Sequence, residues 1–446
     1  MFPLPFRRRL AWVGGLVAAG AVLAAGACSD EDAGAAGPGG GANVAGQGQG
    51  EAGGGGAAGG GPGAAGSGGG AAGSGGGGAA GSGGATLTLT EYEIPTPNVF
   101  PIVIQTGEDG GLWFTEAGAD QIGRFDLATS TFEEYPLLSS NAFVTAIAHA
   151  PDGNLYASLL EAHRIAKITP AGAVTEIEMP GQGEPGGVVV TRDGRYLYIT
   201  ELLDRLTQLD LQTLTFKSFP LLTQNAGTRF IKEGLDGRVW ASEFAVNRIA
   251  ELDPATGVLR EHVVPTENSS PRGLAVAPDG YLYFSEYDAG KIGRLDTATL
   301  EITEFVVPWE RSAPFGMHVG HDCNLWFADH RANKIGRMTP AGEFVSIDIP
   351  TTVTGGGPFG GGGGFGGGGG GLPGGGGGFG GGGGGFGGGG GFGGGGPPGG
   401  GLGSSSAPTV ITSGPDGTMA FVEQSGNKVG IIRGLVPDAR CAHWRR

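Results

Sequence analysis

Short apolar runs separated by turn residues recur along this chain, and the stretch from Ser270 to Pro308 shows the unit most clearly. Four runs rich in β-branched and aromatic residues occupy Gly273–Ala277, Tyr281–Ser285, Lys291–Leu295 and Glu301–Val307. Pro278-Asp279-Gly280 has the composition of a tight turn between the first two runs. The pattern predicts four short strands of one antiparallel sheet.

The turn aspartate of this unit repeats through the rest of the chain, at Asp109, Asp152, Asp193, Asp236, Asp279, Asp322 and Asp416. Successive spacings are 43, 41, 43, 43 and 43 residues, and the last, 94, equals one period plus an insertion of 51. A four-stranded unit with a period in the low forties is typical of β-propellers, whose blades bury their faces by stacking radially. The sequence therefore predicts an all-β fold, a seven-bladed β-propeller with four-stranded antiparallel blades.

The two ends of the repeat region complete one another. Leu87–Pro95 matches the outermost strand of the unit but precedes any inner strand, whereas the seventh copy, Ala407–Gly434, has three inner strands and lacks the outer one. We therefore expect the ring to be closed by an N-terminal outer strand that pairs with the last blade and removes an open edge.

Glycine accounts for 99 of the 446 residues, and most of the excess lies in two blocks, about 33–84 and 354–403. Such segments cannot bury enough apolar surface to offset the entropy of ordering them. We therefore divide the chain into a signal peptide (1–27), a disordered Gly/Ala/Ser-rich tether (28–84) and the propeller (85–446). The second block is a disordered insertion between blades six and seven, where extra loop length costs little.

The first residues have the features of an export signal. Arg7-Arg8-Arg9 precede the apolar run Leu10–Leu23, and small residues lead to Cys28. Ala25-Gly26-Ala27-Cys28 resembles the lipobox of bacterial lipoproteins, in which the cysteine is lipidated. We expect an exported cell-envelope lipoprotein, periplasmic or associated with the outer membrane; the alternative is an ordinary signal peptide cleaved near Ala27.

The net charge of −16 excludes nucleic acid as a partner class, because its recognition begins with a basic surface. We expect a monomer that contacts the membrane only through a lipid anchor. The turn that holds Cys323 and the tail that holds Cys441 should lie on the same face of adjacent blades. In an oxidising envelope these two cysteines are predicted to form a disulfide.

Two motifs recur in the blades. Leu112-Trp113-Phe114-Thr115-Glu116 is followed by Gln121-Ile122-Gly123-Arg124, and Leu325-Trp326-Phe327 by Asn333-Lys334-Ile335-Gly336-Arg337. In these motifs the chain resembles the streptogramin B lyases, also called virginiamycin B lyases, over about residues 87–433. The resemblance implies a seven-bladed propeller; the lyases open a cyclic depsipeptide antibiotic by Mg²⁺-assisted elimination.

The residues that the resemblance assigns to catalysis are not matched. Thr409 stands where the family has its general-base His, Ala407 where it has a metal-binding Glu, and Phe315 where it has a substrate-binding His. A second metal carboxylate of the family would fall near Glu423. Because proton abstraction needs a base within reach of the proton, and Thr cannot serve, we expect lyase activity to be absent.

Residues seven positions before each turn aspartate should line one mouth of the central channel. They are Ile102, Thr145, Gly186, Arg229, Arg272, Phe315 and Thr409. Arg229 and Arg272, from adjacent blades, have the chemistry of a clamp for carboxylate or phosphate. Together with Phe315 and Thr409 they form the candidate ligand site for a small anion. Alternatively, the two arginines pair with nearby acids and are structural.

Acidic residues follow the second strand in six blades, at Glu116, Glu201, Glu243, Glu286, Asp329 and Glu423. Clustered oxygen ligands suit Mg²⁺ or Ca²⁺, so Glu423, Glu286 and Asp329 are the candidate metal ligands, although the sequence requires no cofactor. The structural alternative is that each acid accepts backbone N–H groups or pairs with Arg124, Lys167, Arg294 or Arg337.

These observations favour an exported lipoprotein propeller that acts as a ligand-binding or interaction module, with a small anionic ligand or an envelope protein as partner. One alternative is an active lyase or a metal-dependent lactonase-like enzyme with a relocated catalytic base. A purely structural surface protein is the other. The seven histidines are scattered, and no Ser/His/Asp triad can be assembled from the sequence.

Overall fold

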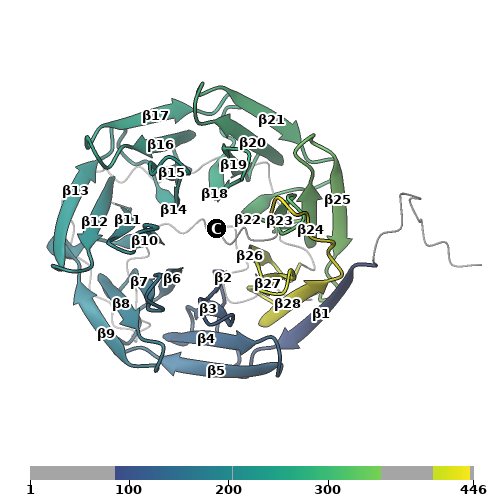
Figure 1. Cartoon of the computed structure of the whole chain (residues 1–446), viewed down its shortest axis with the longest axis horizontal. Coiled ribbons are helices and arrows are strands. Elements are labelled where there is room, and N and C mark those ends of the chain that lie inside the picture. Colours follow the sequence, from purple (N-terminus) through teal and green to yellow (C-terminus); the bar gives the residue numbers. More distant parts are fainter. Residues whose placement is uncertain (1–85, 203, 353–404, 442–446) are drawn as a thin grey trace, which may run out of the picture. The chain divides into compact units, whose positions relative to one another are not determined.

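Seven four-stranded antiparallel sheets are arranged around a central channel, as the computed structural model shows (Figure 1). It describes residues 86–202, 204–352 and 405–441, all within one compact unit, Ala79–Arg446. The predicted signal peptide, tether, lipidation site Cys28 and glycine-rich insertion lie outside the described residues. In these ranges the only helix is a 3-10 turn, Pro180–Gln182, and no helix is long enough to cross a membrane.

The strands follow the predicted blades. Blade one is β2 (Ile104–Thr106), β3 (Leu112–Glu116), β4 (Gln121–Asp126) and β5 (Thr131–Pro136). Blade two is β6 (Val144–His149), β7 (Leu155–Leu159), β8 (Arg164–Ile168) and β9 (Val174–Glu178). Blade three is β10 (Pro185–Val190), β11 (Tyr196–Glu201), β12 (Arg205–Asp210) and β13 (Thr215–Pro220). Blade four is β14 (Thr228–Glu233), β15 (Val239–Glu243), β16 (Arg248–Leu252) and β17 (Leu259–Val263).

The remaining blades repeat this order from the channel outward. Blade five is β18 (Pro271–Val276), β19 (Tyr281–Glu286), β20 (Lys291–Asp296) and β21 (Ile302–Val306). Blade six is β22 (Pro314–Val319), β23 (Leu325–Asp329), β24 (Lys334–Met338) and β25 (Phe344–Asp348). Blade seven joins β26 (Pro408–Ser413), β27 (Met419–Glu423) and β28 (Lys428–Arg433) to β1 (Thr88–Glu93).

The ring is closed by the N-terminal strand, as the sequence predicted. In Figure 1, β1 lies along the outer edge of β28, and the two pair antiparallel from Thr88 opposite Arg433 to Glu93 opposite Lys428. Asn427 extends the joint, because its side-chain amide donates to the carbonyl oxygens of Ile94 and Thr96. This pairing covers the outer edge of β28, which would otherwise remain open.

The turn aspartates have the same structural role in all seven blades, which explains why they recur at a regular spacing. Each side chain accepts a hydrogen bond from the backbone N–H two residues later, at 3.0–3.2 Å. The residue between has a positive φ and is glycine in six blades. In blade six that position is Cys323, with φ 58°. Since L residues with a side chain rarely adopt this conformation, Cys323 stands in a place made for glycine.

Cys323 forms a disulfide with Cys441, and the Cα atoms of the two residues are 5.4 Å apart. The bond ties the segment after β28 to the first turn of blade six. It therefore links two neighbouring blades, and Asp438 N strengthens the same contact by donating to His321 O.

The recurring Phe and Gly of the two motifs are explained by one cross-strand contact. Phe114, Phe284, Phe327 and Phe421 on the second strands face Gly123, Gly293, Gly336 and Gly430 on the third strands. A Cβ atom added at Gly293 would lie 2.1 Å from the Phe284 ring. In blades two and four an alanine pair occupies this position. The phenylalanine ring thus occupies the space that a side chain at the opposite glycine would need.

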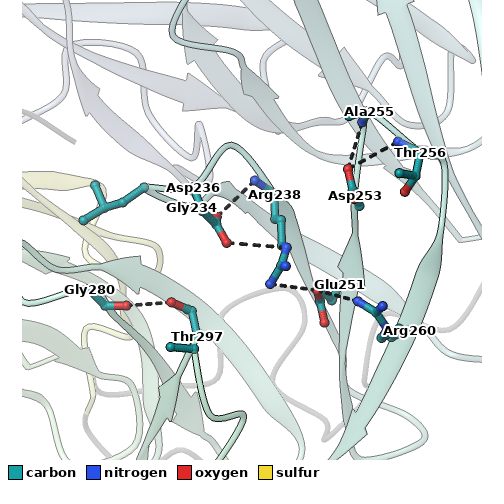
Figure 2. A network of polar contacts seen from close by, with 12 residues as sticks. Gly234, Asp236, Arg238, Glu251, Asp253, Ala255, Thr256, Arg260, Gly280 and Thr297 are labelled. Carbon is teal, nitrogen blue, oxygen red and sulfur yellow. Dashed lines mark hydrogen bonds and ion pairs between the residues drawn. The ribbon is translucent and has the colours of Figure 1, made fainter.

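Polar networks outside the channel fix the blades. In blade four, Arg238 lies between Asp236 and Glu251, and Arg260 reaches Glu251 from the outer strand (Figure 2). Asp253 accepts the N–H groups of the following turn. These charges neutralise one another, so the network has a structural explanation.

Candidate functional site

The inner strands of all seven blades enclose a channel cavity of about 410 Å³. Six of the seven expected mouth residues line it, namely Ile102, Thr145, Gly186, Arg229, Arg272 and Phe315. Among the described residues, four basic side chains and two acids face the cavity: Arg192, Arg229, Lys232 and Arg272 against Glu108 and Glu233. Arg192 and Glu233 pair at 3.7 Å, and Glu108 is exposed. The interior of this acidic protein is therefore positively charged.

Arg272 is surrounded by aromatic rings. Its guanidinium carbon lies 4.0 Å from the ring centre of Tyr287, 5.5 Å from Phe244 and 5.4 Å from Phe315. Rings that stack on a guanidinium plane hold its orientation and leave its N–H edge available. The Nε atom is buried, and no acceptor for it is found among the described residues. Desolvation lowers the pKa of Arg272, so an anion beside it would be stabilising.

Arg229 comes from the adjacent blade and shares the ring of Phe244, which lies 5.6 Å from its guanidinium carbon. Desolvation and the positive charge of Arg272 lower the pKa of Arg229 to about 10. The charge of Arg272 therefore acts on Arg229. Both arginines line the cavity, and both guanidinium groups lie against the ring of Phe244.

Thr409 does not line the channel, contrary to expectation. Its side chain is buried and donates a hydrogen bond of 2.7 Å to the carbonyl oxygen of Ile102 in the next blade. Thr409 therefore stabilises the contact between blades seven and one. Phe315 remains at the channel, where its ring packs on His330 and on the rings beside Arg272.

The acids that follow the second strands do not form the candidate metal site, and the structural alternative accounts for them better. Glu116, Glu201, Glu243, Glu286, Asp329 and Glu423 are all buried, and none of them lines the channel. Asp329 accepts hydrogen bonds from Trp309, Ser312 and Ala313, and Glu201 pairs with Arg205. The suggested partner Arg124 instead pairs with Asp109, Arg337 with Asp322, and Arg294 donates to Pro340 O. Asp329 accepts a hydrogen bond from the backbone N–H of Ala313, as the structural alternative expected for these acids.

Four of these acids face a second carboxyl group on the outer strand of the same blade. Burial, and then the charge of the second carboxylate, raise the pKa of Glu116 to about 8 beside Glu134 and of Glu243 to about 8 beside Glu261. The same causes raise the pKa of Glu423 to about 8 beside Glu91 and of Glu286 to about 7 beside Glu304. Glu116, Glu243 and Glu423 therefore hold a proton at neutral pH, whereas Glu286 is about half protonated there.

The outer carboxylates connect neighbouring blades. Glu261 accepts hydrogen bonds from Leu222 N, Thr223 N and Thr223 Oγ1 of the preceding loop, and Arg248 lies 3.3 Å away. Burial opposes ionisation of Glu261, but these donors and the arginine outweigh it and hold its pKa below the ordinary value. The same arrangement recurs at Glu91 with Thr351 and at Glu304 with Thr266. The acids thus have a structural role.

The carboxylates that were expected to bind Mg²⁺ or Ca²⁺ do not fit a metal site. Glu286 and Glu423 each face an outer-strand carboxyl, and Asp329 is occupied by its donors. Within the described ranges, no three His, Cys, Asp or Glu residues come together around a common point. Ala407 brings no ligand atom to the place where the resemblance puts a metal-binding Glu.

Sequence reasoning missed Lys232, which lines the channel three residues after Arg229. The register that identified Arg229 would have found it if the count had continued along the strand. His149, His318 and His321 also line the cavity, whereas His330 lies outside it, against Phe315 and the carbonyl oxygen of Pro408.

Comparison with protein families finds a match to the virginiamycin B lyase family over residues 80–280 and 181–364. Comparison with curated proteins finds no sequence that matches. Among solved structures, a streptogramin B lyase is similar, with 25% identity, a TM-score of 0.63 and coverage of 78% of this chain and 97% of that one. A catalytically inactive virginiamycin B lyase from Staphylococcus aureus with quinupristin has 24% identity and a TM-score of 0.63, over 79% and 100%. Hydrazine synthase of Kuenenia stuttgartiensis shares the fold at 14% identity and a TM-score of 0.56, over 78% and 98%.

Proposed function

The chain belongs to the virginiamycin B lyase family, and we propose that it is an anion-binding module of that family rather than a lyase. Its ligand is a small carboxylate or phosphate, held in the channel by Arg229 and Arg272. Thr409, Ala407 and Phe315 supply neither a base nor a metal ligand at the positions where the family has them.

The observation that carries the proposal is the setting of Arg272. A guanidinium group is enclosed by three aromatic rings at the channel wall, and its neighbouring cation is another arginine. Glu243 and Glu286, the acids of the same two blades, are turned to Glu261 and Glu304 and do not offset this charge. Two like charges held close in a desolvated site favour an anionic ligand.

The test is titration of the protein with octanoate and with inorganic phosphate by calorimetry, before and after Arg272→Gln. The variant should bind at least about tenfold more weakly, since a charge-assisted hydrogen bond contributes about 1.5–3 kcal/mol. Arg260→Gln, which removes an outer-strand arginine paired with Glu251, is the matched control and should bind as the parent does. Unchanged anion affinity in Arg272→Gln, or a variant that only loses stability, would contradict the proposal.

We also propose that the protein is an exported lipoprotein anchored through Cys28. The support is the N-terminal sequence alone, with its basic residues, apolar run and lipobox-like Ala25-Gly26-Ala27-Cys28. Expression of the full chain with a labelled fatty acid should give a labelled protein in the membrane fraction. Cys28→Ala should remove the label, and persistent labelling of that variant would reject the anchor.

A further inference from the structure

Lys232 is a second cation in the channel, deeper than the arginines. It follows Arg229 by three residues in β14 (Thr228–Glu233), across an irregularity in the pairing with β15 between Thr228 and Ile231, and therefore lies further along the channel. His318 in β22 and Thr412 in β26 occupy the corresponding position of their own strands, and both line the cavity. Desolvation, and then the charge of Lys232, lower the pKa of His318, so the charge of Lys232 reaches that imidazole.

Lys232 differs from the other five lysines, all of which lie in the described ranges. Lys291, Lys334 and Lys428 pair with carboxylates, and Lys167 and Lys217 lie over aromatic rings. No hydrogen bond, ion pair or ring contact of the Lys232 amine is found among the described residues. The adjacent Glu233 is engaged by Arg192. Protein surrounds the amine, and desolvation lowers its pKa.

The wall between the two cationic levels is apolar. It includes Val188, Leu274 and Met317, each of which lines the cavity and stands one position before that of Lys232 in its own strand. An aliphatic wall with a cation at each end matches a ligand that has a methylene chain between two acidic groups, because both parts are then desolvated against suitable partners.

Building on the proposed function, we propose that Lys232, with His318 beside it, binds a second acidic group of the same ligand. The substrate class of the channel is then an elongated dianion, such as an α,ω-dicarboxylate. Arg229 and Arg272 take one carboxylate, Lys232 takes the other, and His318 is placed to donate a hydrogen bond to it. The second carboxylate of the ligand offsets the charge of Lys232, for which no carboxylate partner is found among the described residues.

The test compares suberate with octanoate, which has the same chain and lacks the second carboxylate, in the parent and in Lys232→Met. The parent should bind suberate about tenfold or more tightly than octanoate. Lys232→Met should lose this preference and leave octanoate affinity unchanged. Lys217→Met, which removes the same charge from the outer strand β13, should retain the preference. Succinate, too short to reach both levels, should bind more weakly than suberate.

The outcomes separate the two proposals. If octanoate binding depends on Arg272 but suberate binds no more tightly, or if Lys232→Met weakens both ligands equally, the second site is rejected and the first stands. If neither ligand responds to Arg272→Gln, the arginine site is rejected. Lys232→Arg keeps the charge and should keep at least part of the preference. Should Lys232→Met fold poorly, loss of the preference in Lys232→Arg as well would overturn the role of the charge.

Discussion

The carboxyl pair of blade four makes the stability of this protein depend on pH in an unusual direction. Glu243 is buried and beside Glu261, and its pKa is raised from 4.5 to about 8. Between these values the folded protein keeps a proton that the unfolded chain has released. Since stability rises with pH only where the unfolded state binds more protons, it must here fall as pH rises from about 4.5 to about 8.

The size of the effect follows from the shift. Burial and the neighbouring carboxylate raise the pKa of Glu243 by an amount that corresponds to on the order of 5 kcal/mol, an upper bound. Below about pH 4.5 the contribution is fully present, and above about pH 8 the loss is complete. Glu116, Glu286 and Glu423 titrate in the same window.

Glu243→Gln isolates this contribution. The amide keeps a hydrogen-bond donor toward Glu261 at every pH and cannot ionise, so it mimics the protonated acid. Urea unfolding of parent and variant at pH 5, 7 and 9 should give similar free energies at pH 5. At pH 9 the variant should be more stable by up to about 5 kcal/mol. The control Glu261→Gln should be destabilised already at pH 5, because Leu222 N and Thr223 then lose a charged acceptor.

An identical pH dependence in the parent and in Glu243→Gln would refute the reasoning. It would mean that the buried carboxyl is ionised at neutral pH and is compensated by Arg248, 3.3 Å from Glu261, rather than protonated. A variant less stable than the parent at pH 9 would have the same meaning.

Four further predictions concern the fold and the chemistry. Gly293→Ala should lower the free energy of unfolding by about 1–3 kcal/mol, because the new Cβ meets the Phe284 ring, and adding Phe284→Ala should restore part of it; additive losses would contradict this contact. Cys323→Ser should cost about 2–4 kcal/mol through loss of the disulfide, and Cys323→Gly about 1 kcal/mol less, since glycine suits the positive φ; equal melting temperatures would oppose this. Deleting residues 86–95 should lower the melting temperature by several degrees, because β28 loses its partner, and an unchanged value would reject ring closure as a source of stability. With Mg²⁺, the purified protein should not open a streptogramin B faster than buffer, and clear turnover would show a base elsewhere.

The blades were predictable because each depends on local chemistry. An aspartate that caps its own turn, and a glycine after it, leave the same signal in every repeat. Ring closure and the Cys323–Cys441 disulfide could be predicted from the order of the strands and blades around the ring. The Phe284–Gly293 complementarity was visible only as a motif, because its cause is a contact across two strands.

The site was predictable only in part. Counting from the turn placed Arg229 and Arg272 together, since position along an inner strand sets depth in the channel. The same counting failed for Glu243, because its direction depends on Glu261, Thr223 and Arg248, which come from an outer strand, a neighbouring loop and a third strand. The sequence of one strand does not indicate which residues of other strands and loops will pack against it. Lys232 was overlooked because the count stopped at the first mouth position of each inner strand and did not continue along β14.

The pairing of β1 (Thr88–Glu93) with β28 (Lys428–Arg433) also imposes an order of events on synthesis. These strands are the first and the last of the described chain, and a contact between such distant segments forms slowly. Because the N-terminal part folds first while the chain is being made, β1 must wait with an unpaired edge until β28 has emerged. Incomplete chains therefore expose an edge that the finished ring hides. Strand exchange between molecules is a hazard of the unfinished protein, and it ends when the last blade closes.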